Sequence, residues 1–369
     1  MVCCWGIAVL TPTAIAQPID PLQIDRSDPL IPKGYGRRQL SSFEKYRLQK
    51  EIAKLDKNAT TELKLNNVDL AKKLWYRRLR LSRVLGTQAE VKALGKVGAI
   101  AWQENLGEDV RNIAARLEAI HAAEATNNKS SVLLNELAVA YESIKYLDKA
   151  VDIYQHLATN PNHKNKANDK LGELYLALFD YDRAAKIYQT KLANATSQKE
   201  QKTIVLTLVE IYDRNGQTNK SIEAKEQLLK YHSGEKQPKE ISALKIEIAQ
   251  DYETLRQVQK AIEFYQQAFD LAFKNQLLAI ASDALERIGK LQEQENIAQA
   301  IETYNRLIAI QQQSYNYYGL INTYDILGKI YLKSNQNKAK HFFQRGLDTA
   351  ITLDYKVEYF RDRLTKLPK

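Results

Sequence analysis

Two stretches of the chain repeat the same residue pattern at a constant offset of 34 positions. The pattern is a large apolar residue, a small residue and a tyrosine, followed by an alanine and a second tyrosine. Self-similarity at such a period is typical of solenoids, in which each unit buries its apolar side against the next unit. The two copies are Leu137, Ala138, Tyr141, Ala150 and Tyr154, and Leu171, Gly172, Tyr175, Ala184 and Tyr188.

Further copies extend this pattern over most of the chain. Apolar residues return at three- and four-residue spacing, as in Leu171, Leu174 and Leu178, and this spacing predicts amphipathic helices. One copy is weak, because Ser221 and Lys225 stand where the others have alanine and an aromatic residue. The small-residue position is occupied in turn by Gly98, Ala138, Gly172, Val209, Ala249, Gly289 and Gly328.

These motifs resemble the tetratricopeptide repeat. The resemblance implies an all-α fold, a right-handed superhelical solenoid of antiparallel helix pairs. It places the repeats at residues 97–353, a basic helical pair before them at residues 41–96, and a capping helix and tail at residues 354–369. Residues 74–86 and 93–105 also resemble uncharacterised, signal-peptide-bearing tetratricopeptide proteins of cyanobacteria, which implies the periplasm or the thylakoid lumen.

The N-terminus predicts export. Residues 1–16 carry no charged side chain, and Ala14-Ile15-Ala16 fits the small-residue pattern of a signal peptidase site. Both cysteines lie in this segment, so the mature chain would have none. Residues 17–40 are rich in proline and predict an extended, mobile linker. If the segment is not a functional signal, the alternative is a cytoplasmic protein.

The net charge of +10 is concentrated in one region. Residues 33–96 contain 17 Lys and Arg against 6 Asp and Glu, whereas residues 97–369 contain 36 against 35. One basic segment allows three interpretations: a solenoid helix with ordinary cationic side chains, a contact with an anionic membrane surface, or a contact with an acidic protein. The candidate patch consists of Lys72, Lys73, Arg77, Arg78, Arg80 and Arg83.

A second candidate surface follows from the resemblance, which implies that the first helix of each pair lines a concave groove. In the middle copies these groove positions are acidic. They predict a trough for a basic protein or peptide segment, attracted electrostatically; the alternative is that the carboxylates pair with nearby lysines. The groove candidates are Glu142, Asp169, Glu173, Glu210, Asp213 and Glu253.

Catalytic signatures are absent from the sequence. The five histidines are scattered without a second ligand at helical spacing, so no metal site is predicted. We find no phosphate-binding loop, nucleophile elbow or zinc-protease motif, and expect no catalytic residue, cofactor or small-molecule substrate. Nucleic-acid binding is disfavoured, because the repeat region is nearly neutral and most tyrosines occupy core positions. We therefore predict a non-enzymatic scaffold that binds a protein or peptide.

Overall fold

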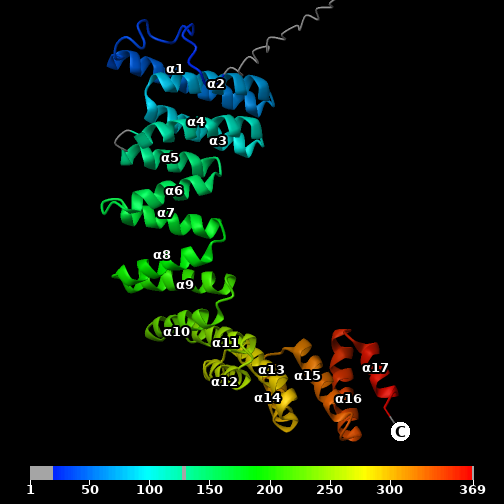
Figure 1. Ribbon diagram of the computed structural model, residues 1–369. Coiled ribbons are helices and arrows are strands. Elements are labelled where there is room, and N and C mark those ends of the chain that lie inside the picture. Colours follow the sequence, from blue (N-terminus) through cyan, green and yellow to red (C-terminus); the bar gives the residue numbers. More distant parts are fainter. Residues whose placement is uncertain (1–19, 127–129, 368–369) are drawn as a thin grey trace, which may run out of the picture. The chain divides into compact units, whose positions relative to one another are not determined.

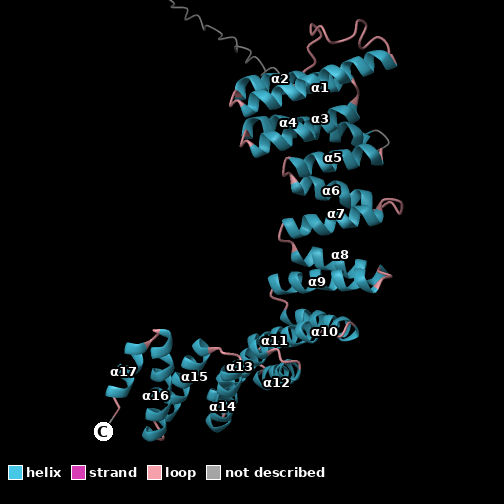
Figure 2. Cartoon of the chain, turned by 180° about the vertical axis from the view of Figure 1, so that it is seen from behind, coloured by secondary structure: helices cyan, strands magenta, loops and turns pink. Residues whose placement is uncertain are grey.

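The computed structural model describes residues 20–126 and 130–367. Within these residues the chain forms seventeen helices, and its only β-pairing is an isolated bridge between Tyr35 and Arg38. Figure 2 shows helices and connecting loops throughout. The prediction of an all-α fold built from helix pairs is confirmed. The chain divides into two compact units, residues 1–178 and 179–369, which are described separately below.

In the first unit, successive helices pack side by side (Figure 1). The basic helical pair that was predicted within residues 41–96 is α1 and α2, and the first two repeat copies are α3/α4 and α5/α6. The helices are α1 (Ser42–Lys64), α2 (Val68–Val84), α3 (Thr87–Gln103), α4 (Gly107–Thr126), α5 (Ser131–Ser143), α6 (Leu147–Ala158) and α7 (Lys164–Ala177).

The second unit continues the alternation of first and second helices and ends in a short capping helix. Its helices are α8 (Tyr181–Asn194), α9 (Gln198–Arg214), α10 (Thr218–Gly234), α11 (Pro238–Thr254), α12 (Val258–Lys274), α13 (Leu278–Glu295), α14 (Ile297–Gln313), α15 (Tyr317–Tyr331), α16 (Gln336–Leu353) and α17 (Val357–Thr365).

Several turns inside the helix pairs share one geometry, whereas those before α14 and α16 do not. In the shared geometry the second residue after the first helix adopts a left-handed conformation, for example Lys145 at φ 62° and Gly216 at φ 65°. The next amide then donates to a carbonyl five residues earlier, as from Tyr146 to Tyr141 at 2.9 Å. This is the Schellman arrangement, which satisfies carbonyls left unpaired at a helix end. The turn reverses the chain within a few residues, so the second helix returns against the first.

The core lies where the repeat pattern places it. Of the nine tyrosines at repeat positions, six are buried, while Tyr188, Tyr252 and Tyr331 are half-buried. Small residues leave room for aromatic rings: a methyl group added at Gly328 would lie 2.4 Å from the Phe343 ring. The second helix therefore seats its aromatic residue directly on the small residue of the first helix.

Residues 20–40 differ from the extended, mobile linker that the sequence predicts. They form consecutive turns, and Leu22 is buried at 3% exposure. Five more apolar side chains of this segment, Ile24 and Leu30 among them, pack on the α1–α2 cluster around Leu48 and Leu81. Proline and aspartate create the turns, and these apolar residues supply the burial that an extended tether lacks. The predicted signal peptide at residues 1–16 lies outside the described residues.

Candidate functional site

Three of the six predicted groove carboxylates belong to the first unit. Glu142 on α5 accepts a hydrogen bond from the Tyr154 hydroxyl at 2.7 Å. Lys170 on α7 lies 2.8 Å from Glu173 and 3.9 Å from Glu142, so it links the two first helices. Its hydrogen bond to Glu173 raises the pKa of Lys170 against a small opposing effect of burial. Asp169 lies exposed on α7. The structure thus brings Glu142 and Glu173 together around one lysine.

The other three carboxylates belong to the second unit. Glu210 pairs with Arg214 one turn later on α9 at 2.9 Å. Glu253 on α11 accepts a hydrogen bond from Tyr265. Asp213, also on α9, is exposed and forms an ion pair with the buried side chain of Lys225. These contacts favour the alternative of internally paired carboxylates over a trough of unneutralised charge.

A tyrosine–glutamate hydrogen bond recurs in three helix pairs, a feature that the sequence interpretation missed. In each pair the tyrosine of the second helix donates to a glutamate four residues after the small residue of the first helix. Burial, followed by this hydrogen bond, raises the pKa of each tyrosine. The spacing of 11 or 12 residues could have revealed it. The pairs are Tyr154 with Glu142, Tyr265 with Glu253, and Tyr304 with Glu293.

The weak copy, which contains Ser221 and Lys225, has an ion pair at the position of this hydrogen bond. Lys225 occupies on α10 the position that Tyr265 holds on α12, and its side chain is 5% exposed. Its ammonium lies 3.3 Å from Asp213 and 2.8 Å from Asp251. Ser221, where other copies have alanine, donates a hydrogen bond to Asp213. In this copy an ion pair therefore replaces the tyrosine–glutamate hydrogen bond of the other copies. The change at Lys225 is matched by the aspartates that surround it.

Apolar side chains are exposed on the first helices beside these carboxylates. Val132 and Val139 on α5 are 58% and 43% exposed, and Leu206 on α9 is 50% exposed. The two valines lie seven residues apart, so they share one face of α5 two turns from each other. Asn135 lies between them on the same side of the helix. The first-helix face of α5 thus combines apolar and polar contacts.

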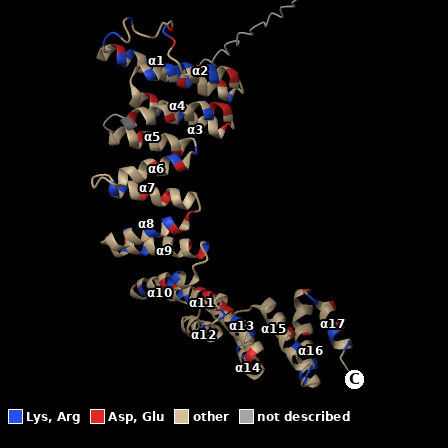
Figure 3. Ribbon diagram, viewed as in Figure 1, with Lys and Arg blue, Asp and Glu red and all other residues tan. Residues whose placement is uncertain are grey.

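The predicted basic patch on α2 is engaged within the chain. Its arginines hold residues 20–31 against the helix, which gives that segment polar as well as apolar anchors. Figure 3 shows the positions of the charged residues on α1 and α2. The contacts are Arg77 with the Asp28 carboxylate at 2.8 and 3.1 Å, Arg80 with the Pro21 carbonyl at 3.0 Å, and Arg83 with the Leu22 carbonyl at 3.1 Å.

Two more cations of the patch also have partners. Lys72 pairs with Asp109 at 2.8 Å, and Arg78 is buried and pairs with Asp56. Lys73 is exposed. The other cations find partners inside the chain because α2 packs between α1 and α3 and so has neighbours on two sides. Five of the six cations therefore bind groups within the chain, and they do not form a free basic surface on the helix.

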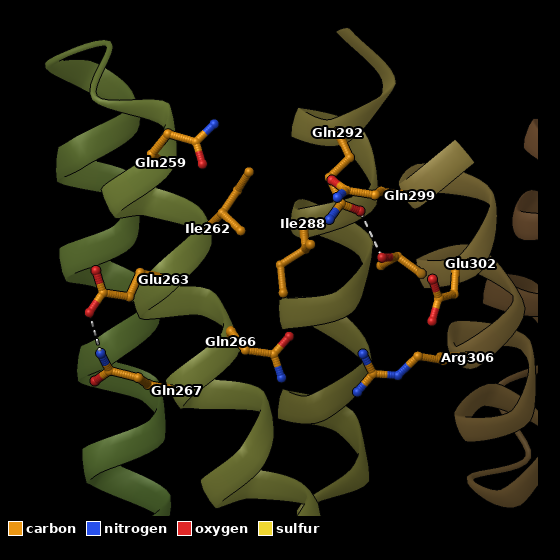
Figure 4. A pocket seen from close by; sticks show the side chains of 11 residues that line it. Gln259, Ile262, Glu263, Gln266, Gln267, Ile288, Gln292, Gln299, Glu302 and Arg306 are labelled. Carbon is orange, nitrogen blue, oxygen red and sulfur yellow. Dashed lines mark hydrogen bonds between the residues drawn. The ribbon is translucent and has the colours of Figure 1, made fainter. Parts of the chain in front are cut away.

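An open pocket of about 660 Å³ lies between the second helices α12 and α14, with part of α13 as its floor. Figure 4 shows Gln266 of α12 and Arg306 of α14 pointing toward each other across it, with Ile288 of α13 between the two helices. Gln292 accepts a hydrogen bond from Thr303 at 2.7 Å. Glutamines dominate the lining, so the pocket can offer hydrogen bonds, but it holds no nucleophile–base pair.

Histidines and acidic groups do not converge on a metal-binding geometry. Among residues 20–126 and 130–367, no group of three or more His, Cys, Asp or Glu side chains could hold a metal ion. His232 contacts Gln237 at 2.6 Å, and the ring of His341 packs against Phe342. Of the helices described, none has the length and apolar character needed to cross a membrane.

Two segments match tetratricopeptide repeat family models, residues 169–203 and residues 283–314. The first contains the Leu171–Tyr188 copy found in the sequence, and the second contains α14 and most of α13. No curated protein matches the chain.

Several solved structures are similar to this chain. BtubC from P. vanneervenii is 19% identical, with a TM-score of 0.37, over 57% of this chain and 90% of that one. A signal transduction ATPase with a tetratricopeptide repeat sensor from Pyrococcus horikoshii is 12% identical, with a TM-score of 0.39, over 87% and 48%. The C-terminal part of a repeat protein from Cytophaga hutchinsonii is 16% identical, with a TM-score of 0.38, over 70% and 96%. The chain is a helical-repeat protein in which residues 169–203 and 283–314 match tetratricopeptide repeat models.

Proposed function

We propose that the protein is a non-enzymatic scaffold whose first helices α5 and α7 bind a partner segment carrying apolar and basic side chains. The observation that supports this most directly is the exposure of Val132 and Val139 on one face of α5. Exposed apolar side chains grouped beside polar ones mark interaction surfaces. In this repeat the other apolar residues of α5, such as Leu137, are buried.

The basic character of the partner is inferred from Lys170. Its ammonium already sits between Glu142 and Glu173, at 3.9 and 2.8 Å. It occupies the place that a cation of a bound segment would take. Both members of the Lys170–Glu173 pair are solvent-exposed, so this pair contributes little stability and is readily exchanged. A lysine or arginine of the partner would then replace Lys170 while its apolar residues cover the valines.

Peptide display against the immobilised protein tests the proposal. Wild-type protein should enrich peptides that combine apolar residues with Lys or Arg. The double variant Val132→Asp, Val139→Asp should weaken binding of those peptides at least roughly tenfold, because covering the exposed half of each valine contributes about 0.7 kcal/mol. Leu65→Asp is the control, since Leu65 is 64% exposed in the same unit but lies away from α5.

Lys170→Gln tests the charge argument separately. Removing this internal cation should strengthen binding of the basic peptides, because Glu142 and Glu173 would then lack their lysine. Equal affinity of the Val132/Val139 variant and wild type would reject the binding face. Unchanged affinity in Lys170→Gln would reject only the basic partner.

The proposal extends to an exported protein, on the support of residues 1–16 alone, which end in Ala14-Ile15-Ala16. Fusing residues 1–40 to a reporter that is active only after export would test this. A reporter retained in the cytoplasm would indicate the alternative location.

A further inference from the structure

Among the residues that the structure describes, the first helix is α1, and it has an outer face opposite its packing contact. Its buried residues, Leu48, Ile52, Leu55 and Ala59, lie on one side of the helix. At 3.6 residues per turn, a second set of residues falls on the opposite side. This outer face consists of Phe43, Tyr46, Arg47, Lys50, Lys54, Lys57 and Lys64.

The charge on the outer face has one sign. The four acidic residues of α1 are Glu44, Glu51, Asp56 and Glu62, and all lie on its flanks, about 100° or more from the centre of the face. Lys54 pairs with Glu51 at 2.7 Å. In the part of the chain that the structure describes, the other four cations of the face form no ion pair: Arg47, Lys50, Lys57 and Lys64.

Two aromatic residues stand at the start of this cationic face. Phe43 is 74% exposed and Tyr46 is 63% exposed, and they lie nearly one turn apart. A terminal repeat normally presents a polar outer side, because no further repeat covers it. Exposed rings among cations therefore indicate a surface that another body covers.

We infer that the outer face of α1 docks on an anionic lipid bilayer. The helix has 23 residues and so extends about 34 Å in a nearly straight line, which lets a flat surface contact Lys50, Lys57 and Lys64 together, while Arg47 lies at the edge of the face beside residues 29–33. Lys and Arg are attracted to anionic headgroups, while Phe and Tyr enter the interfacial layer. This contact is independent of the peptide-binding face proposed for α5 and α7. It also moves the membrane contact that the sequence suggested for residues 72–83 from α2 to α1.

The alternative polyanion is a nucleic acid, which the arrangement favours less. Phosphates of a nucleic acid curve away from a straight row of cations, whereas lipid headgroups form a plane. The tyrosine has an apolar ring and a polar hydroxyl, the combination enriched at membrane–water interfaces. Charge complementarity and the two rings together therefore point to lipid.

Co-sedimentation with vesicles tests the inference. The full chain should bind vesicles of phosphatidylcholine with 30% phosphatidylserine at low salt, and should bind neutral phosphatidylcholine vesicles much less. The triple variant Lys50→Gln, Lys57→Gln, Lys64→Gln should bind anionic vesicles roughly 100-fold more weakly, at about fivefold per cation. Phe43→Ala with Tyr46→Ala should lose roughly tenfold.

A matched control separates position from total charge. Lys230→Gln, Lys239→Gln, Lys274→Gln removes three exposed lysines of the second unit and should bind as wild type does. Replacing Lys50, Lys57 and Lys64 with Arg should restore binding, and circular dichroism should show equal helix content in all variants.

Several results would overturn the inference. They are no binding of wild type to anionic vesicles at low salt, equal loss in the α1 and control triple variants, or no effect of the aromatic substitutions. Binding of a single-stranded oligonucleotide that is tighter than vesicle binding and depends on the three α1 lysines would assign the face to nucleic acid instead.

Discussion

Replacing Lys225 with methionine should destabilise the helices around α10 more than any exposed lysine substitution does. The ammonium lies 2.8 Å from Asp251 and 3.3 Å from Asp213, and its side chain is 5% exposed. At an effective dielectric constant of about 20, the attraction across 2.8 Å is about 6 kcal/mol, and desolvation offsets much of it.

The net loss depends on what remains after the lysine is gone. Asp251 is only 15% exposed and would keep a charge without a partner, a change that costs 3–5 kcal/mol in buried pairs. Asp213 is 43% exposed, so water can replace its partner. We therefore expect a loss of about 3 kcal/mol, at the low end of that range. Lys225→Tyr should lose less, because Tyr265 makes the corresponding contact in the next pair.

The pH dependence follows from the same contacts. Burial opposes the charge on Lys225, but the hydrogen bond that Lys225 donates to Asp251 and the charges of both aspartates outweigh it and raise the pKa of Lys225. A raised pKa in the folded state means that this stabilisation is complete below the ordinary lysine pKa of 10.5. It is lost as the pH rises through the higher folded value.

Hydrogen exchange measured by mass spectrometry suits this prediction, because repeats can open separately and a single global transition is not assured. Amides of α9, α10 and α11 should exchange about 100-fold faster in Lys225→Met. Lys230→Met is the control, since Lys230 is exposed on the same helix. Adding Asp251→Asn should recover part of the loss. Equal protection in Lys225→Met and Lys230→Met would refute the reasoning.

Three further predictions concern local packing and capping. Gly328→Ala should leave the protein about 1–3 kcal/mol less stable than Gly234→Ala in urea unfolding, because the new methyl group meets a buried ring, whereas Gly234 has open space. Glu44 should titrate near pH 2 by NMR, because the hydrogen bond that Arg38 donates to its carboxylate lowers the pKa of Glu44 to about 2. Its contribution to stability is present above pH 4.5 and is lost as the pH falls toward 2. Asp28→Asn should weaken the bidentate contact with Arg77 and speed proteolysis within residues 20–40.

Each of these predictions has a contrary result. Equal stability of the two glycine variants would mean that the ring can move aside. A Glu44 pKa near 4.5 would mean that Arg38 does not hold its carboxylate. Unchanged proteolysis of Asp28→Asn would mean that apolar packing alone anchors the N-terminal segment.

The helical fold could be predicted from the sequence because its period is local. The pattern of Leu137, Ala138 and Tyr141 recurs at a shift of 34 because each helix pair packs against the next one in the same way. The same register predicted which tyrosines are buried, and six of nine are. The weak copy at Lys225 needed the structure, because its second partner, Asp251, comes from a different helix pair.

The candidate sites were predicted less well, because charge counts along the chain ignore contacts between distant residues. Arg77 and Asp28 are 49 residues apart, and no helical spacing connects them. The groove carboxylates were placed on the correct helices, but several of their partners, such as Tyr154 for Glu142, lie on other helices. Whether an arginine forms an ion pair within the chain or stays exposed depends on which elements pack around it.

The sequence by itself determined the repeat, the helices and the buried side of each helix, since these follow from periodicity within a few turns. Only the tertiary structure decided which basic residues remain exposed. Packing of residues 20–31 on α2 covers or engages the arginines there, while Lys50 and Lys57 on the outer side of α1 are exposed. The excess positive charge is a property of the sequence, but its availability to a partner is a property of the fold.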